Sequence, residues 1–219
     1  YRFKIQEGTN IFDLEKLLLS SKLKLDCPDF NCLNNQLNFT EGTLMPETYF
    51  YNFNSPASNI LIKSQDSFIE YAELLWEKKQ PSNPLKTLDE ALILASIVEK
   101  EAGNNKEKPI IAGVFLNRLN LNMRLQADPT IIYGLLPNFN GNITKLNLQD
   151  SSNRYNTYKI KGLPPTPIAM ISKSSLEAVI LGIPNNYVYF VAKGDGTHYF
   201  STKYADHLKA VRKFQLNKS

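Results

Sequence analysis

The stretch TLDEALILASIVEKEAG, residues 87–103, predicts the helix around which the rest of the fold is organised. Thr87 followed by Glu90 has the spacing of a capping box, in which two side chains satisfy free backbone N–H groups at the start of a helix. Gly103 is typical of the residue just beyond a helix end. Apolar side chains fill most of the positions in between, so we expect a helix that is buried on most sides.

One carboxylate, Glu101, lies on the apolar stripe of this helix, in its last turn. It shares a face with Ile97 and Val98 through the three- and four-residue spacings. The negative end of the helix dipole and partial burial both raise the pKa of a carboxyl group at such a position. A carboxyl that stays protonated near neutral pH is what a general acid requires. A solvated Glu101 paired with Lys100 or Lys106 also fits the pattern.

The composition is that of an ordinary globular protein, since 42% of the 219 residues are hydrophobic. The net charge of +4 is spread along the chain without a basic stripe, so we expect no nucleic-acid partner. No apolar stretch reaches the ~20 residues that span a membrane. The chain opens on YRFKI, residues 1–5, which alternates like a strand already under way, and we expect an anchoring or targeting segment to precede it.

The two cysteines, Cys27 and Cys32, are separated by four residues and lie in one predicted loop. Two cysteines and two histidines are too few for a structural zinc site, so we expect no metal. A local disulfide, which would suit an oxidising compartment, and a pair of free thiols both fit the spacing.

Hydrophobic periodicity divides the chain into two parts that meet near the proline-rich segment 80–84. Residues 1–84 are predicted to form a small N-terminal unit and residues 85–219 a larger mixed α/β domain, which together make an α+β fold. In the first part we predict strands or extended segments at 3–6 and 41–52, helices at 10–20 and 67–78, and a loop around the cysteines. In the second we predict helices at 87–101 and from 109 onward, loops from 123, a hairpin of strands 187–191 and 199–201 about the turn 194–196, and a last helix at 204–214.

Polar and aromatic side chains are dense in the second part, in segments 123–130 and 155–158 and at the end of the helix that begins at 109. A carbohydrate groove uses such groups, because aromatic rings pack on sugar faces and amides bond hydroxyl and N-acetyl groups. Each of these residues taken singly also suits a structural role. Asp128, directly before Pro129, suits a residue that caps a turn.

Four blocks of the second part, in the same order and at the same spacing, closely resemble the YceG-like (MltG) family of endolytic murein transglycosylases. The blocks are ASIVEKEAG (95–103), VFLNRLNLNMRLQADPTIIYG (114–134), YNTYKIKGLPPTPIA (155–169) and YFVAKGDGTHYFS (189–201). More weakly, FKIQEGTNIFDLEKLL (3–18) resembles the family's LysM-like segment and EGTLMPETY (41–49) its aromatic-acidic motif. Departures are Glu47 for a usual Asp, Thr166 for a usual Gly, and Ile171-Ser172 for a Pro-Gly pair.

The resemblance implies a LysM-like N-terminal subdomain and a YceG-like catalytic domain in which Glu101 is the catalytic residue. Glu99 lies on a different face of the same helix, and both a surface position and a supporting role for Glu101 fit it. The residues that it implies along the substrate groove are Asn117, Arg118, Gln126, Asp128, Tyr155, Asn156, Tyr158 and His198. The implied reaction cleaves the bond between N-acetylmuramic acid and N-acetylglucosamine inside peptidoglycan strands, without water, metal or organic cofactor, and leaves 1,6-anhydro ends that terminate nascent strands. The implied partners are these glycan strands and peptidoglycan synthases (penicillin-binding proteins), with the full-length protein anchored at the outer face of the cytoplasmic membrane.

Two other functions stay open from the sequence. A lysozyme-like glycoside hydrolase would need a second carboxylate, ~5 Å from the first for retention or ~6.5–9.5 Å for inversion, and Asp128 is the obvious candidate. A catalytically inert module would bind peptidoglycan, or position the synthases, without cleaving the strand.

Overall fold

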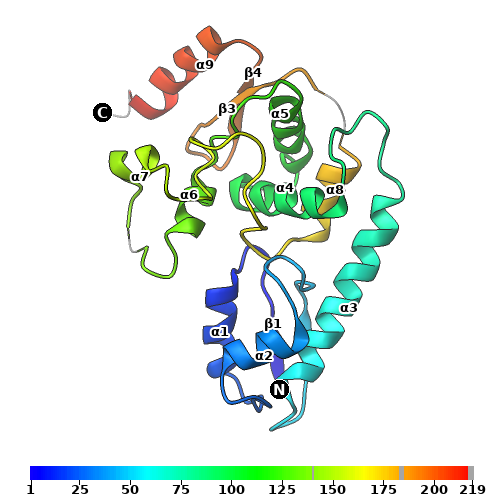
Figure 1. Cartoon of the computed structure of the whole chain (residues 1–219). Helices are drawn as coiled ribbons and strands as arrows, with labels where there is room; N and C mark the ends of the chain where they lie inside the picture. Colours follow the sequence, from blue (N-terminus) through cyan, green and yellow to red (C-terminus); the bar gives the residue numbers. More distant parts are fainter. Residues whose placement is uncertain (140, 183–184, 217–219) are drawn as a thin grey trace.

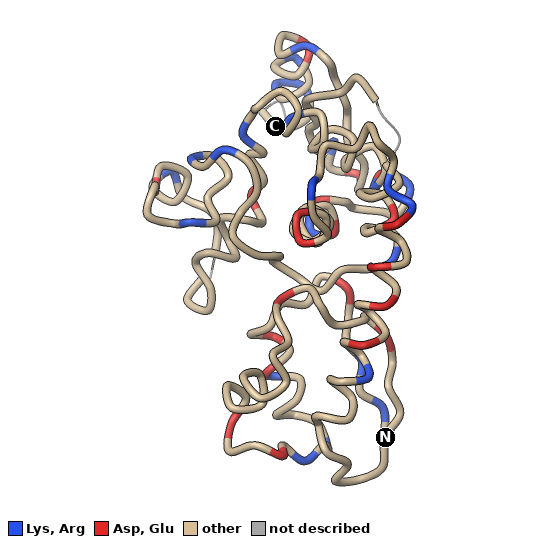
Figure 2. The backbone as a smooth tube through the Cα atoms, turned by 45° about the vertical axis from the view of Figure 1, so that its right-hand side comes forward, with Lys and Arg blue, Asp and Glu red and all other residues tan. Residues whose placement is uncertain are grey.

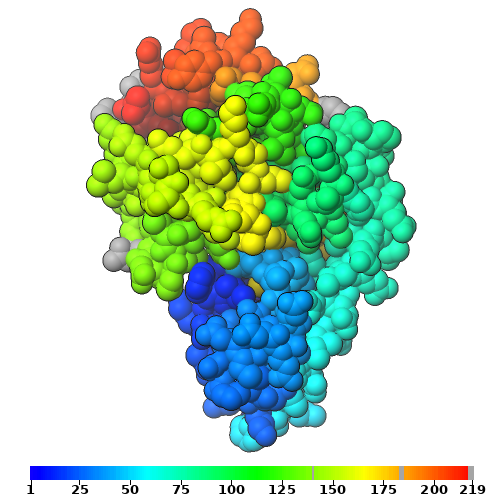
Figure 3. Space-filling view, in the orientation of Figure 1, coloured from blue at the N-terminus to red at the C-terminus, as the bar shows by residue number. Residues whose placement is uncertain are grey.

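A computed structural model of the chain describes residues 1–139, 141–182 and 185–216. Figure 1 shows an elongated arrangement, with the N-terminal elements at one end, the helix α4 at the centre, and the last hairpin and helix at the other end. In the space-filling view the N-terminal part forms the narrower end (Figure 3). The described strands form two separate two-stranded sheets among many helices, which confirms a mixed α and β fold.

The N-terminal unit is built on the antiparallel pair β1 (Arg2–Lys4) and β2 (Thr48–Phe50). Its helices are α1 (Ile11–Leu19), α2 (Phe30–Leu37) and the first half of α3 (Ala57–Trp76), and their buried side chains share one hydrophobic cluster with those of the strands. Phe3 faces Tyr49 across the two strands, and both side chains are buried. The alternation that predicted the first strand therefore places Phe3 in this core.

The loop predicted around the cysteines is wrong for residues 30–37, which form α2. The side chain of Asp29 accepts a hydrogen bond from the backbone N–H of Cys32 at 2.8 Å, and this N-cap starts the helix. Cys27 and Cys32 form a disulfide, so of the two alternatives for this pair the free thiols are wrong. The bridge joins the segment before α2 to its first turn.

The helix predicted at 67–78 begins ten residues earlier, at Ala57. Polar residues interrupt the apolar pattern of its first turns, but Ile60, Leu61 and Ser64 are all buried at helical spacing. The helix contributes to two cores, because Leu61 belongs to the N-terminal cluster and Phe68 to the larger one. The boundary at residue 84 stays a prediction, since α3 joins both parts.

The helix α4 (Leu88–Glu101) forms the centre of the larger core, and every residue from 91 to 98 is buried. The side chain of Thr87 accepts a hydrogen bond from the N–H of Glu90 at 3.2 Å, as the capping pattern predicts. Glu90 in return accepts from the N–H of Lys86, at 2.6 Å, one residue before the predicted partner. The predicted central helix is thus confirmed with both of its ends.

Besides α3, the described helices that pack against α4 are α5 (Lys108–Asn120), α6 (Asp128–Gly134) and α8 (Lys173–Ile180). The prediction of loops after residue 123 is wrong for α6, for α7 (Lys145–Gln149) and for α8. In α8, Ser172 is the N-cap, and Leu176 and Val179 are buried against the core. These helices are short and their apolar stripes have few repeats, so periodicity alone did not reveal them.

The last elements are the antiparallel hairpin β3 (Tyr189–Ala192) and β4 (His198–Ser201), the helix α9 (Tyr204–Val211) and its π-helical extension η1 (Arg212–Leu216). The predicted hairpin and last helix are confirmed with shifted ends. The hairpin turn lies on the end of α4, where a Cβ added to Gly103 would come within 2.5 Å of the backbone oxygen of Gly196. Gly103 is therefore required for this close approach, in addition to following the helix end.

Charged residues of both signs are interspersed over the two ends of the molecule (Figure 2). Over the part of the chain that the structure describes, no helix combines the length and the apolar composition needed to cross a membrane.

Candidate active site

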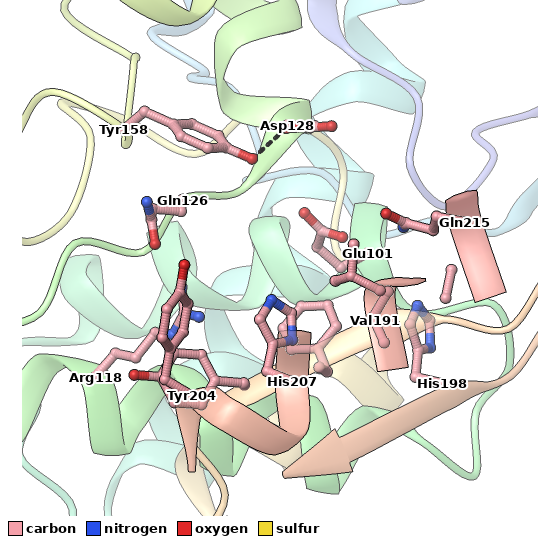
Figure 4. A pocket seen from close by; sticks show the side chains of 14 residues that line it. Glu101, Arg118, Gln126, Asp128, Tyr158, Val191, His198, Tyr204, His207 and Gln215 are labelled. Carbon is pink, nitrogen blue, oxygen red and sulfur yellow. Dashed lines mark hydrogen bonds between the residues drawn. The ribbon is translucent and has the colours of Figure 1, made fainter. Parts of the chain in front are cut away.

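A cavity of about 490 Å³ lies between the C-terminal end of α4, the loop that leads into α6, and the hairpin with α9 (Figure 4). Six of the residues predicted from sequence line it: Glu101, Arg118, Gln126, Asp128, Tyr158 and His198. They are contributed by segments that are up to 97 residues apart in sequence, so the fold brings together side chains that the sequence only suggested as a group.

The Glu101 carboxyl points into this cavity (Figure 4). Among the described residues none forms a hydrogen bond with it, so no donor stabilises its charged form. Burial is the largest cause that raises the pKa of Glu101, the charge of Asp128 adds to it, Arg118 opposes it, and the resulting value is about 8. The side chain is therefore mostly protonated at neutral pH and free to meet a ligand.

Glu99, two residues earlier on the same helix, has the opposite environment. It forms a buried ion pair with Lys108 at 3.2 Å, with side-chain exposures of 8% and 4%. Its carboxylate also accepts hydrogen bonds from the side chains of Ser172 and Ser175 and from the backbone N–H of Ser172. Burial alone would raise the pKa of Glu99, but these bonds and the charge of Lys108 outweigh burial and lower it. The surface position considered for Glu99 is therefore wrong.

Asp128, the other carboxylate of the cavity, accepts a hydrogen bond from the Tyr158 hydroxyl at 2.7 Å. The capping role considered for it is wrong, because α6 begins at Asp128 itself and has no side-chain cap. Burial raises the pKa of Tyr158, and the neighbouring Asp128 charge adds to the shift. The tyrosine thus stays a neutral donor beside a carboxylate.

Arg118 joins two walls of the cavity. Its Nε donates to the carbonyl of Val188 at 2.7 Å, and its Nη1 donates to the carbonyl of Leu125 at 2.6 Å. The guanidinium also lies over the ring of Tyr189, 5.6 Å from its centre. Arg118 therefore holds the loop before α6 against the start of β3, as well as supplying a positive charge near Glu101.

Gln126 has a left-handed backbone with φ of 52°, a conformation that is unfavourable for a residue with a Cβ. Its N–H donates to the carbonyl of Thr157 at 3.2 Å, and the next N–H, of Ala127, donates to the Thr157 hydroxyl at 2.9 Å. The loop is thus held by Thr157 in a strained shape, and the Gln126 side chain lines the cavity. Such strain is frequent where a side chain must be aimed at a ligand.

Three of the predicted groove residues lie outside the cavity wall, and their described contacts are internal. The Asn117 amide donates to the carbonyls of Asn185 and Tyr187. The Tyr155 hydroxyl bonds that of Thr166 at 2.8 Å. The fully buried Asn156 donates to carbonyls of residues 147, 148 and 150. Substrate contact by Asn117, Tyr155 and Asn156 stays a prediction, and this geometry does not favour it.

One wall of the cavity is supplied by α9 and η1 and is not among the predicted site residues. Its members are Tyr204, His207, Val211 and Gln215. The ring of His207 stacks on Tyr189, with 5.2 Å between the ring centres. Burial lowers the pKa of His207, and the Arg118 charge lowers it further, so this imidazole is neutral at pH 7. The signal was present, because the four residues are spaced by three and four positions, which places them on one helix face.

Comparison with known proteins decides the family. The model of the YceG-like family matches residues 1–213. The chain belongs to the YceG-like family. This agrees with the resemblance of the four sequence blocks in the second part, and the match also includes the N-terminal unit.

Among YceG-like relatives, the chain is 34% identical over 211 residues to a Bacillus subtilis (strain 168) protein named endolytic murein transglycosylase, covering 91% of this chain and 56% of the relative. It is 31% identical over 176 residues to a Streptococcus pneumoniae (strain R6) protein of the same name, covering 78% of this chain and 31% of that protein. The chain thus spans about half or less of these relatives' lengths.

The fold also matches a solved structure, the crystal structure of a yceG-like protein from Listeria monocytogenes. The TM-score is 0.77 at 30% sequence identity, and the match covers 95% of this chain and 75% of the other. The mixed helix and strand architecture described above is therefore shared with a YceG-like protein.

Proposed function

We propose that this chain is the catalytic part of an endolytic murein transglycosylase and that Glu101 is its general acid. The observation on which the proposal rests is the Glu101 carboxyl, which is free of described hydrogen-bond partners, faces the cavity, and has a pKa raised to about 8. The name of the relatives in Bacillus subtilis and Streptococcus pneumoniae supports the same reaction class.

In the proposed reaction, neutral Glu101 donates its proton to the glycosidic oxygen between N-acetylmuramic acid and N-acetylglucosamine. The bond from the anomeric carbon breaks, and positive charge develops on the muramyl ring. The resulting Glu101 carboxylate then takes the proton of the muramyl C6 hydroxyl, whose oxygen bonds the anomeric carbon. The products are a 1,6-anhydromuramyl end and a free N-acetylglucosamine hydroxyl, and Glu101 is protonated again.

Arg118 supports the second half of this cycle, because a positive charge near Glu101 stabilises its transient carboxylate. Asp128 supports the first half, because its negative charge favours the protonated acid. The two charges therefore act on Glu101 in opposite directions, as a group that donates and then accepts a proton requires.

The alternative hydrolase would use Asp128 as nucleophile or base. Asp128 lines the same cavity, but Tyr158 already donates a hydrogen bond to its carboxylate. A hydrolase would release reducing muramyl ends and the transglycosylase 1,6-anhydro ends, so the products discriminate between the two.

We further propose that the N-terminal unit is LysM-like and that the peptidoglycan strand is the substrate. The site of action would then be outside the cytoplasm, at the outer face of the cytoplasmic membrane, with an anchor that precedes the chain and with peptidoglycan synthases nearby. The cysteine pair fits this location, since disulfides persist in oxidising compartments.

The test is digestion of purified sacculi, with mass spectrometry of the released muropeptides, by the wild type and by Glu101→Gln. Gln keeps the shape of the side chain but has no transferable proton. We expect 1,6-anhydro products from the wild type, a loss of about 10²- to 10⁴-fold in rate for the variant, and unchanged binding to sacculi. Equal cleavage by Glu101→Gln would overturn the acid, and binding without cleavage by the wild type would favour the inert module.

A further inference from the structure

His198 has a partner that no part of the proposed mechanism uses, the carboxylate of Glu107. The Nδ1 atom of His198 lies 2.9 Å from Oε2 of Glu107, and the backbone N–H of His198 donates to Oε1 at 2.9 Å. The exposures of the two side chains are 9% and 13%. One carboxylate thus holds both the backbone and the ring of the same residue.

The surroundings leave the ring little freedom. It packs edge-on against Phe190, with 5.4 Å between the ring centres, and the centre of the Phe200 ring lies 6.2 Å from its own. Glu107 is itself fixed, because the side chain of Asn104 accepts a hydrogen bond from its N–H at 3.2 Å and donates to the carbonyl of Gly196 at 3.2 Å. The orientation of the imidazole is therefore set by the packing of the hairpin on the turn before α5.

This contact determines which nitrogen carries the hydrogen when the ring has only one. A carboxylate group can only accept, so the Nδ1 atom next to Glu107 is the donor and carries that hydrogen. Nε2 is then an acceptor with a free lone pair. None of the hydrogen bonds of the described residues involves Nε2, and His198 lines the cavity that contains Glu101.

We propose that His198 binds the glycan through Nε2, which accepts a hydrogen bond from a sugar hydroxyl or N-acetyl N–H group, and that Glu107 is the residue that positions it for this contact. This inference rests on the proposed function and adds a recognition element to it. His198 fixes the sugar relative to Glu101, and Glu107 acts only through His198.

The decisive variant is Glu107→Gln, which is nearly identical in shape. Its amide oxygen must face the backbone N–H of His198, so its NH₂ group faces Nδ1 and donates to it. Nδ1 then becomes the acceptor, the proton moves to Nε2, and the acceptor offered to the sugar is lost. We expect ¹⁵N NMR of the two imidazole rings to show this tautomer change at His198 and none at His207.

With the tautomer change, we expect Glu107→Gln to lose about 10- to 100-fold in kcat/KM on sacculi, the cost of leaving one polar group of the complex unpaired. Two further variants separate recognition from structure. His198→Asn keeps an amide near the position of Nδ1 and removes Nε2, so it should stay folded and lose activity. Glu177→Gln changes a carboxylate outside the cavity that is bonded to Tyr71, and it should be unaffected.

Binding is measured separately, with E101Q as the background, by titrating purified glycan strands into E101Q alone and into E101Q with E107Q. Weaker binding of the double variant by about 10-fold or more supports the inference. If the wild type cleaves and Glu107→Gln keeps its kcat/KM and its binding within twofold despite the tautomer change, the inference is wrong and the proposed function stands. If the wild type does not cleave, the proposed function fails, and the binding comparison still tests His198.

Discussion

Two carboxyl groups near the end of α4, two residues apart, have opposite surroundings. Glu99 is enclosed by a lysine and two serines and its pKa is lowered, whereas Glu101 faces a cavity without described hydrogen bonds and its pKa is raised to about 8. Both are largely shielded from water, so burial alone does not distinguish them. Donors to the charged form decide the outcome. One carboxylate ties α4 to α5 and α8, and the other is kept ready to transfer a proton.

The largest effect on stability is expected from breaking the buried ion pair of Glu99 with Lys108. Glu99→Gln leaves the ammonium of Lys108, which is only 3% exposed, without its counter-ion, and should lower the free energy of unfolding by about 3–5 kcal/mol. Urea denaturation at pH 7 measures this, with the exposed Glu177→Gln as control. A change below about 0.5 kcal/mol would be the size of an ordinary surface substitution and would contradict the supporting role.

Replacing Glu101 should have the opposite effect on stability at alkaline pH. Because the pKa of Glu101 is raised from 4.5 to about 8, the folded state holds its proton more tightly than the unfolded chain does. Stability from this group is present below pH 4.5 and is lost as the pH rises toward 8.

Glu101→Gln should therefore be more stable than the wild type by about 1–3 kcal/mol at pH 8.5 and equal to it at pH 4. Thermal denaturation across this range measures the difference. Burial raises the pKa of Glu41 to about 7, so this group also changes the stability with pH. Its effect is the same in the wild type and in Glu101→Gln and cancels in the difference between them. A variant that is less stable at high pH would show that the Glu101 carboxylate is stabilised by the fold.

A smaller effect should follow from Asp128→Asn, which removes a negative charge that raises the pKa of Glu101. The alkaline limb of the pH–rate profile should move to lower pH by about half a unit to one unit, while cleavage at pH 6 is largely kept. Glu177→Gln, a carboxylate with a tyrosine partner outside the cavity, should leave the profile unchanged. Complete loss of cleavage at every pH would instead favour Asp128 as the second carboxylate of a hydrolase.

The sequence predicted the parts of the fold in which local signals and burial agree. The capped apolar run of α4, with Thr87 at its start, was predicted with its ends, and so was the hairpin turn at 194–196. The helices α2, α6, α7 and α8 were missed because none exceeds eight residues. Packing against α4 stabilises a helix such as α8 more than its own propensity does, and that contact is not visible in the sequence.

A site residue was predictable from the sequence where a charged side chain occupies an otherwise apolar helix face, as Glu101 does. Its counterpart Glu99 could not be placed, because its partners come from α5 and the start of α8. Asn117 and Asn156 show the converse problem, since an amide suited to sugars is equally suited to backbone carbonyls, and here both bind carbonyls. The face of the last helix with Tyr204 and His207 could have been found from its spacing.

The most direct test of the contrast is a carboxyl ¹³C NMR titration of the free enzyme, in which Glu101→Gln and Glu99→Gln identify the two resonances. We predict that Glu101 titrates with a midpoint near pH 8 and Glu99 below the ordinary value of 4.5. If Glu101 titrates near 4.5, it is ionised at neutral pH, and the account of it as the general acid is contradicted.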